Sequence, residues 1–133
     1  MPIQYVRDDA HKRILVTTGG EIGLDDIVGI VDRQAKDRTW SYAMLYDARA
    51  AAGTPTIDEM RRLVLHIGRL TTAHGPRGPV ALVANGPLLE AAERVYASLG
   101  TLTGLNVRVF TTLVEAKRWL VTLETNRGAN PWW

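Results

Sequence analysis

The 133-residue chain contains no cysteine. A disulfide framework, a thiolate nucleophile and every cysteine-based zinc site are therefore excluded. Long hydrophobic runs are also missing: PVALVA at 79–84 is far short of the roughly 20 apolar residues that span a bilayer. The first 13 residues, MPIQYVRDDAHKR, are polar and carry both signs of charge, unlike a signal peptide. We expect a cytoplasmic protein with no integral membrane segment.

A strong excess of charge of one sign is absent as well. The chain has 16 Lys and Arg against 14 Asp and Glu, a formal net charge of +2. Arg61, Arg62 and Arg69 share a segment with Asp58 and Glu59, which is typical of a solvated helix face. A nucleic-acid-binding protein would show a basic stripe with interleaved aromatic residues. We therefore expect no nucleic-acid partner.

Motifs for catalysis and for metal or phosphate binding are scarce. Of the three histidines, His66 and His74 have no carboxylate at a metal-ligand spacing and His11 lies in a turn, so we expect no metal. Neither serine stands in a G-x-S-x-G elbow. The glycines of GGEIG, residues 19–23, match neither G-x-G-x-x-G nor the phosphate loop with its Lys and Ser/Thr. The sequence predicts no cofactor and favours a protein that is not an enzyme.

Hydrophobic periodicity predicts strands and helices that alternate along the chain. The predicted strands are residues 3–7, 13–18, 42–48, 80–84 and 106–112, and the predicted helices are residues 24–37, 56–73, 88–100 and 113–124. Thr56 with Glu59, and Thr112 with Glu115, have the spacing of capping boxes at two helix starts.

The predicted order is β-β-α-β-α-β-α-β-α. Such an order implies right-handed crossovers and a mainly parallel central sheet with helices packed on it. The first two strands are joined by a short turn, so we expect the first to be an antiparallel edge strand. We predict one α/β domain over residues 1–124 and a mobile C-terminal tail over 125–133.

This element order, together with ILVTTGGEIGLDDI after the first strand and LYDA at the end of the central strand, resembles the STAS fold of anti-sigma-factor antagonists. It is more closely similar to the bacterial SpoIIAA-like family of STAS/SEC14-type proteins. The resemblance covers roughly residues 3–123. It implies a STAS-like fold and a non-enzymatic role, either in partner binding or in binding a small apolar or lipid-like ligand.

The resemblance draws attention to the connection over residues 47–56, which reads DARAAAGTPT. STAS switch proteins carry a phosphorylatable serine there, in an Asp-Ser-Ser/Thr-Gly motif. The motif is missing here, and Thr54 and Thr56 are the only hydroxyls available for modification. A phosphate at a helix N-terminus is electrostatically favoured. However, the role of Thr56 as a helix cap already accounts for that residue.

Asp47 and Arg49 are the other candidate binding residues of this connection. Asp47 ends a buried parallel strand, a position where open α/β sheets contact ligands. Alternatively, it orders the turn by accepting hydrogen bonds from N–H groups of the loop. Arg49 could receive an anionic ligand or remain simply solvated.

Three functional hypotheses remain. The first is a non-enzymatic interaction or regulatory module that binds an unidentified protein partner through loop 47–56 and the N-terminal half of the following helix. The second is a carrier or sensor that binds a small apolar or lipid-like ligand between the sheet and that same helix, which needs a closed apolar cavity of about 300 Å³ or more. The third is an enzyme using Asp47, which needs a perturbed carboxylate in a cleft. Self-association through helix faces or through the tail with Trp132 and Trp133 is a further expectation.

Overall fold

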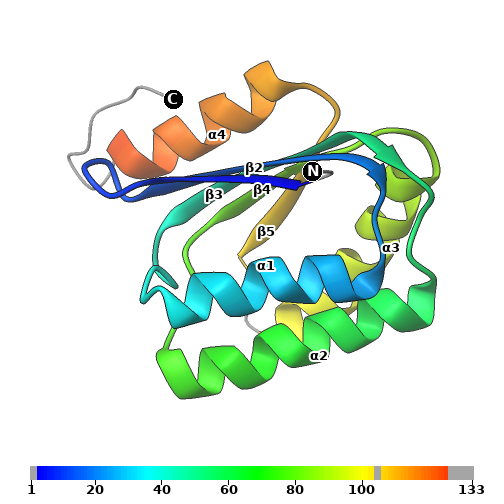
Figure 1. The fold of residues 1–133 in the computed structure, drawn as a ribbon, viewed down its shortest axis with the longest axis horizontal. Helices are drawn as coiled ribbons and strands as arrows, with labels where there is room; N and C mark the ends of the chain where they lie inside the picture. Colours follow the sequence, from blue (N-terminus) through cyan, green and yellow to red (C-terminus); the bar gives the residue numbers. More distant parts are fainter. Residues whose placement is uncertain (1–2, 104–105, 126–133) are drawn as a thin grey trace.

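The computed structural model describes residues 3–103 and 106–125, with side chains for 3–95 and 106–123. Within these residues the elements follow the predicted order (Figure 1). The strands are β1 (Ile3–Asp8), β2 (Arg13–Glu21), β3 (Ala43–Ala52), β4 (Val80–Val83) and β5 (Val107–Phe110), and the helices are α1 (Leu24–Lys36), α2 (Ile57–His74), α3 (Gly86–Thr103) and α4 (Leu113–Thr125). The predicted tail, beyond Thr125, lies outside the described residues, and the domain boundary stays a prediction.

The strand order in the sheet follows the order of the chain, β1-β2-β3-β4-β5. β1 is antiparallel to β2, as predicted, and the other neighbours are parallel. Because parallel crossovers are right-handed, a strand order that never reverses places every crossover helix on one face. Figure 1 shows α1, α2 and α3 on that face and α4 alone on the other. The mixed α/β sheet with an antiparallel edge is thus confirmed.

Side chains of β3 alternate between the two faces. Met44 belongs to the core beneath α1, whereas Leu45 packs with Ala116 and Leu120 of α4. α4 contacts β3, β4 and β5. Leu15 of β2 lies in register with Leu45 and is 39% exposed. On the side of the sheet that carries α4, the described helices therefore leave β1 and β2 uncovered.

The central strand is longer than predicted. The sequence predicts a strand that ends at residue 48 and a loop after it, but β3 continues to Ala52 because residues 50–52 pair with residues 19–21 of β2. β4 pairs only with residues 44–47. Beyond Asp47, β2 and β3 therefore form a two-stranded extension, the β2–β3 ribbon (residues 18–21 and 48–52), which projects past the body of the sheet (Figure 1).

Two helices begin where the sequence predicts a capping box. Thr56 and Glu59 form a reciprocal capping box, with Thr56 Oγ1 accepting from Glu59 N at 3.1 Å. Thr112 Oγ1 likewise accepts from Glu115 N at 3.2 Å. α3 differs: it begins at Gly86 and passes through Gly100, where a stop was predicted, to Thr103.

A buried polar cluster joins the end of α1 to the chain that enters β4. We call it the Gln34 cluster, and its members are Gln34, Thr39, Trp40 and Arg77. The amide Nε2 of Gln34 donates to the carbonyl oxygens of Thr39 and Trp40 at 3.2 and 3.3 Å. Its Oε1 accepts from Arg77 Nε at 2.9 Å. The guanidinium of Arg77 also lies 5.2 Å from the ring centroid of Trp40.

Candidate functional site

A β-bulge lies where the predicted site begins. The register between β2 and β3 shifts at Thr18, which stands opposite both Ala48 and Arg49. An extra residue on one strand interrupts the alternation of its side chains. As a result Ala48 and Ala51, three positions apart, line the same cavity. The bulge therefore directs two small side chains of the ribbon toward α1 and α2.

Asp47 and Arg49 form a bidentate ion pair. Arg49 Nε donates to Asp47 Oδ1 and Arg49 Nη2 donates to Oδ2, both at 2.9 Å. The backbone N–H of Arg49 also donates to Asp47 Oδ1, at 3.2 Å, so the carboxylate orders the backbone as the sequence suggested. These bonds from Arg49 lower the pKa of Asp47 below its ordinary value. The side chain of Asp47 is 15% exposed and that of Arg49 is 43% exposed. The guanidinium of Arg49 is therefore presented to solvent in a fixed orientation.

We expect Arg49→Ala to raise the pKa of Asp47. The side-chain hydrogen bonds from Arg49 are the largest cause of the lowered pKa, and burial, which remains in the variant, acts in the opposite direction. The pKa of Asp47 is lower in the folded protein than in the unfolded chain. The ion pair therefore stabilises the fold fully at pH values above the pKa of Asp47 in the unfolded chain. This stabilisation is lost as the pH falls through the pKa of Asp47 in the folded protein. A pH titration of the Asp47 carboxyl carbon by NMR measures the shift. Arg69→Ala, on α2, is the control, and an unchanged Asp47 titration in Arg49→Ala would contradict the pairing.

Thr54 and Thr56 occupy the connection between β3 and α2. Both are exposed. Thr56 is the N-cap of α2, and its hydroxyl already accepts a hydrogen bond. Among the hydrogen bonds between described residues, none joins either threonine to Asp47 or Arg49. By strand alternation Asp47 also follows Leu45 onto the side of the sheet that carries α4. The structure thus brings Asp47 and Arg49 together and leaves the two threonines apart from that pair.

An apolar cavity of about 70 Å³ lies beneath the β2–β3 ribbon, between the sheet and helices α1 and α2. Ile27 and Val31 of α1, Leu63 and Ile67 of α2, and Leu82 of β4 contribute to its lining. It begins under the ribbon and the start of α2, at Ala51, Gly53 and Pro55. At the opposite end of the sheet it reaches Arg77, Val80 and Val107. The carrier hypothesis from the sequence places an apolar site between the sheet and the second helix, α2, and the structure adds α1 to the lining.

The dimensions of the cavity bear on two of the functional hypotheses. A volume of about 70 Å³ is well below the roughly 300 Å³ that a drug-sized or lipid-like ligand needs. Asp47 is not among the residues that line this cavity. Its carboxylate has a lowered pKa and both oxygens are bonded to Arg49. The environment of Asp47 therefore differs from that of a general base, whose pKa is raised toward the working pH.

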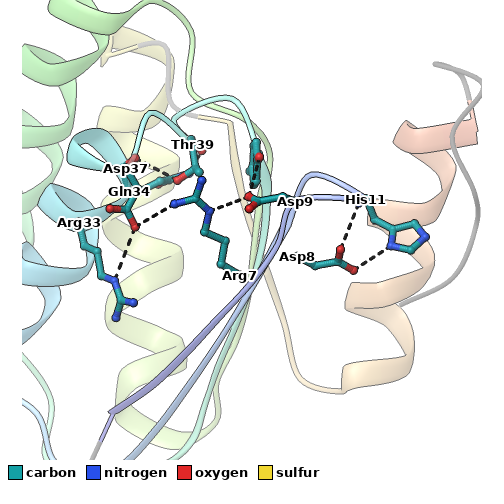
Figure 2. A network of polar contacts seen from close by, with 9 residues as sticks. Arg7, Asp8, Asp9, His11, Arg33, Gln34, Asp37 and Thr39 are labelled. Carbon is teal, nitrogen blue, oxygen red and sulfur yellow. Dashed lines mark hydrogen bonds and ion pairs between the residues drawn. The ribbon is translucent and has the colours of Figure 1, made fainter.

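A second polar cluster lies at the other end of the sheet, around the β1–β2 hairpin. Figure 2 shows Arg7 between Asp9, whose Oδ1 is 2.6 Å from Arg7 Nε, and Asp37 at the end of α1, at 3.5 Å. Asp37 also lies 3.7 Å from Arg33 of α1. The hydroxyl of Tyr42 donates to Asp9 at 2.8 Å.

Each carboxylate of this hairpin cluster already has a partner. The hydrogen bonds from Arg7 and Tyr42 lower the pKa of Asp9, and a hydrogen bond from His11 lowers the pKa of Asp8 (Figure 2). The cluster ties the hairpin to α1 and to the start of β3. The charged and polar side chains of this cluster bond to one another. We therefore assign the cluster a structural role.

Histidine contributes one contact that the sequence did not reveal. His66 Nε2 lies 2.7 Å from Asp32 Oδ1, so this pair joins α2 to α1. Among the side chains described, those of residues 3–95 and 106–123, no three metal-ligating groups come together. None of the helices within residues 3–103 and 106–125 has the length and apolar character needed to cross a bilayer.

The sheet order, the antiparallel edge strand and the two helical layers define a SpoIIAA-like fold, the fold that the sequence predicted. Comparison with solved structures agrees. The chain is similar to an anti-sigma factor antagonist from Mycobacterium paratuberculosis, with a TM-score of 0.53, 16% identity, and coverage of 86% of this chain and 90% of that one. It is also similar to an uncharacterized DUF3478-family protein with a SpoIIAA-like fold from Shewanella loihica, with a TM-score of 0.52, 19% identity, and coverage of 89% and 91%.

At these identities the likeness shows the fold alone. No protein-family model matches the chain, and no curated protein matches it.

Proposed function

We propose that the protein is a non-enzymatic regulatory module of the STAS type that binds a protein partner in the cytoplasm. Its binding face comprises the β2–β3 ribbon, the connection through Thr54 and the N-terminal half of α2. The observation that carries the proposal is the ribbon itself. It projects beyond the sheet, and Arg49, Ala50 and Ala52 on it are exposed.

The ion pair of Asp47 and Arg49 suits this role. It holds the guanidinium in one orientation before a partner arrives, which lowers the entropy cost of association. β4 pairs with β3 only as far as Asp47, so residues 49–52 form a sheet edge on that side among the described residues. An exposed strand edge can add a strand from another protein. One structural neighbour is an anti-sigma factor antagonist, and we carry over from it a partner that is a protein.

Modification of Thr54 or Thr56 belongs to the same proposal as a means of control. Phosphate on Thr54 would add negative charge beside the first turn of α2, where the helix dipole favours it. Phosphate on Thr56 would replace the cap hydrogen bond to Glu59 N. Thr54 is therefore the better candidate.

Crosslinking tests the proposed face. A photoreactive amino acid at position 50 is expected to crosslink to one protein in the cells that make this chain, whereas the same amino acid at position 69, in the C-terminal half of α2, is not. The captured protein, once purified, should bind the unmodified chain directly. Arg49→Glu should weaken that binding roughly tenfold or more, because a charge at the centre of an interface is reversed.

Arg69→Glu is the matched control, since Arg69 is likewise exposed but lies away from the ribbon. Equal binding by Arg49→Glu and Arg69→Glu would remove the ribbon from the interface. Crosslinks from position 69 alone would also refute the proposal.

A further inference from the structure

We propose that β1 is an interface at which two copies of this chain pair edge to edge, so that the five strands of each copy form one continuous sheet. This surface is not part of the β2–β3 ribbon, and the inference does not depend on the partner proposed above. Three observations support it: a strand edge without the usual protection against pairing, an apolar row that runs to that edge, and a strand sequence that complements itself about a two-fold axis.

β1 is an edge strand that is open to pairing. It pairs with β2 on one side, and within residues 3–103 and 106–125 no strand pairs with it on the other side. Native edge strands are commonly protected by a bulge, a proline or a lysine. β1 has none of these over its six residues, Ile3–Asp8, and its register with β2 is unbroken. The strand can therefore accept a further strand.

An apolar row crosses the sheet on the side that carries α4 and continues to this edge. Leu45 of β3, Leu15 of β2 and Val6 of β1 lie in register with one another. Leu45 is buried beneath α4, but Leu15 is 39% exposed and Val6 is 56% exposed. α4 contacts β3, β4 and β5, so the described helices leave the outer part of the row uncovered. A second copy whose own row continues from Val6 would bury these side chains.

The sequence of β1 complements itself about a two-fold axis through Val6. Neighbouring residues of a strand point to opposite faces, so the axis must pass through a residue and not between two residues. With the axis at Val6, Val6 faces its own copy and Gln4 faces Asp8 on the side of α4. On the other side Tyr5 faces Arg7. These pairs give an apolar contact, a hydrogen bond from an amide to a carboxylate, and a cation–π contact.

Other axes near the middle of the strand fit less well. An axis through Arg7 places two guanidinium groups opposite each other, and like charges at directly opposite positions are destabilising. An axis through Tyr5 places a polar residue opposite Val6 and breaks the apolar row. With the axis at Val6, the charge of Arg7 is compensated within each copy, because Arg7 pairs with Asp9 and Asp37 (Figure 2). The observations therefore favour a single register.

Sedimentation equilibrium of the purified chain, from about 1 μM to about 500 μM, tests the proposal. We expect reversible dimerisation. Val6→Asp should weaken it about tenfold or more, because two carboxylates then face each other on the axis. Val114→Asp is the matched control, since Val114 is 65% exposed and lies on α4, and it should dimerise like the unchanged chain. Circular dichroism reports whether both variants are folded.

Cysteine crosslinking tests the register. The chain contains no cysteine, so a single introduced cysteine can form a disulfide only with a second copy. Val6→Cys should give crosslinked dimers under mild oxidation, because residues directly opposite each other have Cβ atoms about 4.5–5.5 Å apart. Gln4→Cys alone should crosslink far less, because Gln4 faces Asp8 in the proposed register. A mixture of Gln4→Cys and Asp8→Cys should give crosslinked heterodimers.

Three results would overturn the inference. The first is a monomer at every concentration, which would leave the edge of β1 for a strand of another protein. The second is equal dimerisation by Val6→Asp and the unchanged chain, which would place the contact on another surface. The third is crosslinking of Gln4→Cys alone as efficient as that of Val6→Cys. Arg49→Glu, which tests the proposed partner face, should dimerise normally, so the two proposals can fail separately.

Discussion

Replacing Gly78 with alanine is expected to destabilise the protein by about 3 kcal/mol or more, at the upper end of the cost of overpacking. Gly78 lies where the chain entering β4 passes against the segment before β3, and its N–H donates to Trp40 O at 2.9 Å. A Cβ atom at this position would collide with the carbonyl groups of Ser41 and Tyr42. Both obstacles are backbone atoms, so relief requires movement of the chain and not of a flexible side chain.

Thermal unfolding measures this effect. For a domain of this size a loss of about 3 kcal/mol lowers the melting temperature by about 10 °C. Gly29→Ala is the matched control: Gly29 lies within α1, and a Cβ there meets nothing within 4 Å. That substitution should stabilise the protein by about 0.5–1 kcal/mol, because alanine favours the helix. If Gly78→Ala and Gly29→Ala had the same melting temperature, the close backbone contact at Gly78 would be contradicted.

Gln34→Leu is expected to cost about 2–4 kcal/mol of stability, chiefly because it removes a buried hydrogen bond to a charged group. Gln34 is fully buried, and its Oε1 accepts from Arg77 Nε. The carbonyl oxygens of Thr39 and Trp40 lose the hydrogen bond from Gln34 Nε2. Each keeps another donor, because Thr39 O accepts from Tyr42 N and Trp40 O accepts from Gly78 N. Most of the loss therefore comes from the contact with Arg77.

A double-mutant cycle separates this contact from other effects. Arg77→Met removes the charge while keeping a long apolar side chain, and the pair Gln34→Leu and Arg77→Met should lose at least about 1 kcal/mol less than the sum of the single variants. Urea unfolding gives the free energies. Gln4→Leu, the same change at an exposed residue of β1, should alter stability by less than about 0.5 kcal/mol. Additive losses in the cycle would show that Gln34 and Arg77 act independently.

Much of the fold could be predicted because its signals are local. The apolar runs of β3 and β4 and the capping boxes at Thr56 and Thr112 each depend on a few neighbouring residues. The length of β3 could not be predicted in this way. Ala50, Ala51 and Ala52 have little intrinsic preference for a strand, and they are strand residues because they pair with residues 19–21 of β2.

The candidate site was harder to predict for the same reason. Asp47 and Arg49 are two residues apart, and both were identified as candidate binding residues from the sequence. The cavity depends on side chains from β2, β3, β4, β5 and three helices, and no short motif encodes such a set. The contact of Gln34 with Arg77 spans 43 residues. The need for glycine at position 78 likewise arises only when two distant segments cross.

The strand order β1-β2-β3-β4-β5 also bears on how the chain folds. Each strand pairs with the next one along the sequence, so each pairing closes a loop no longer than one connecting segment. Loop-closure entropy grows with the length of the loop, and proteins with short-range pairings fold faster than those with long-range ones. During synthesis the N-terminal part emerges first. Every later strand can therefore join a partner that is already in place, and the sheet can grow in the direction of translation.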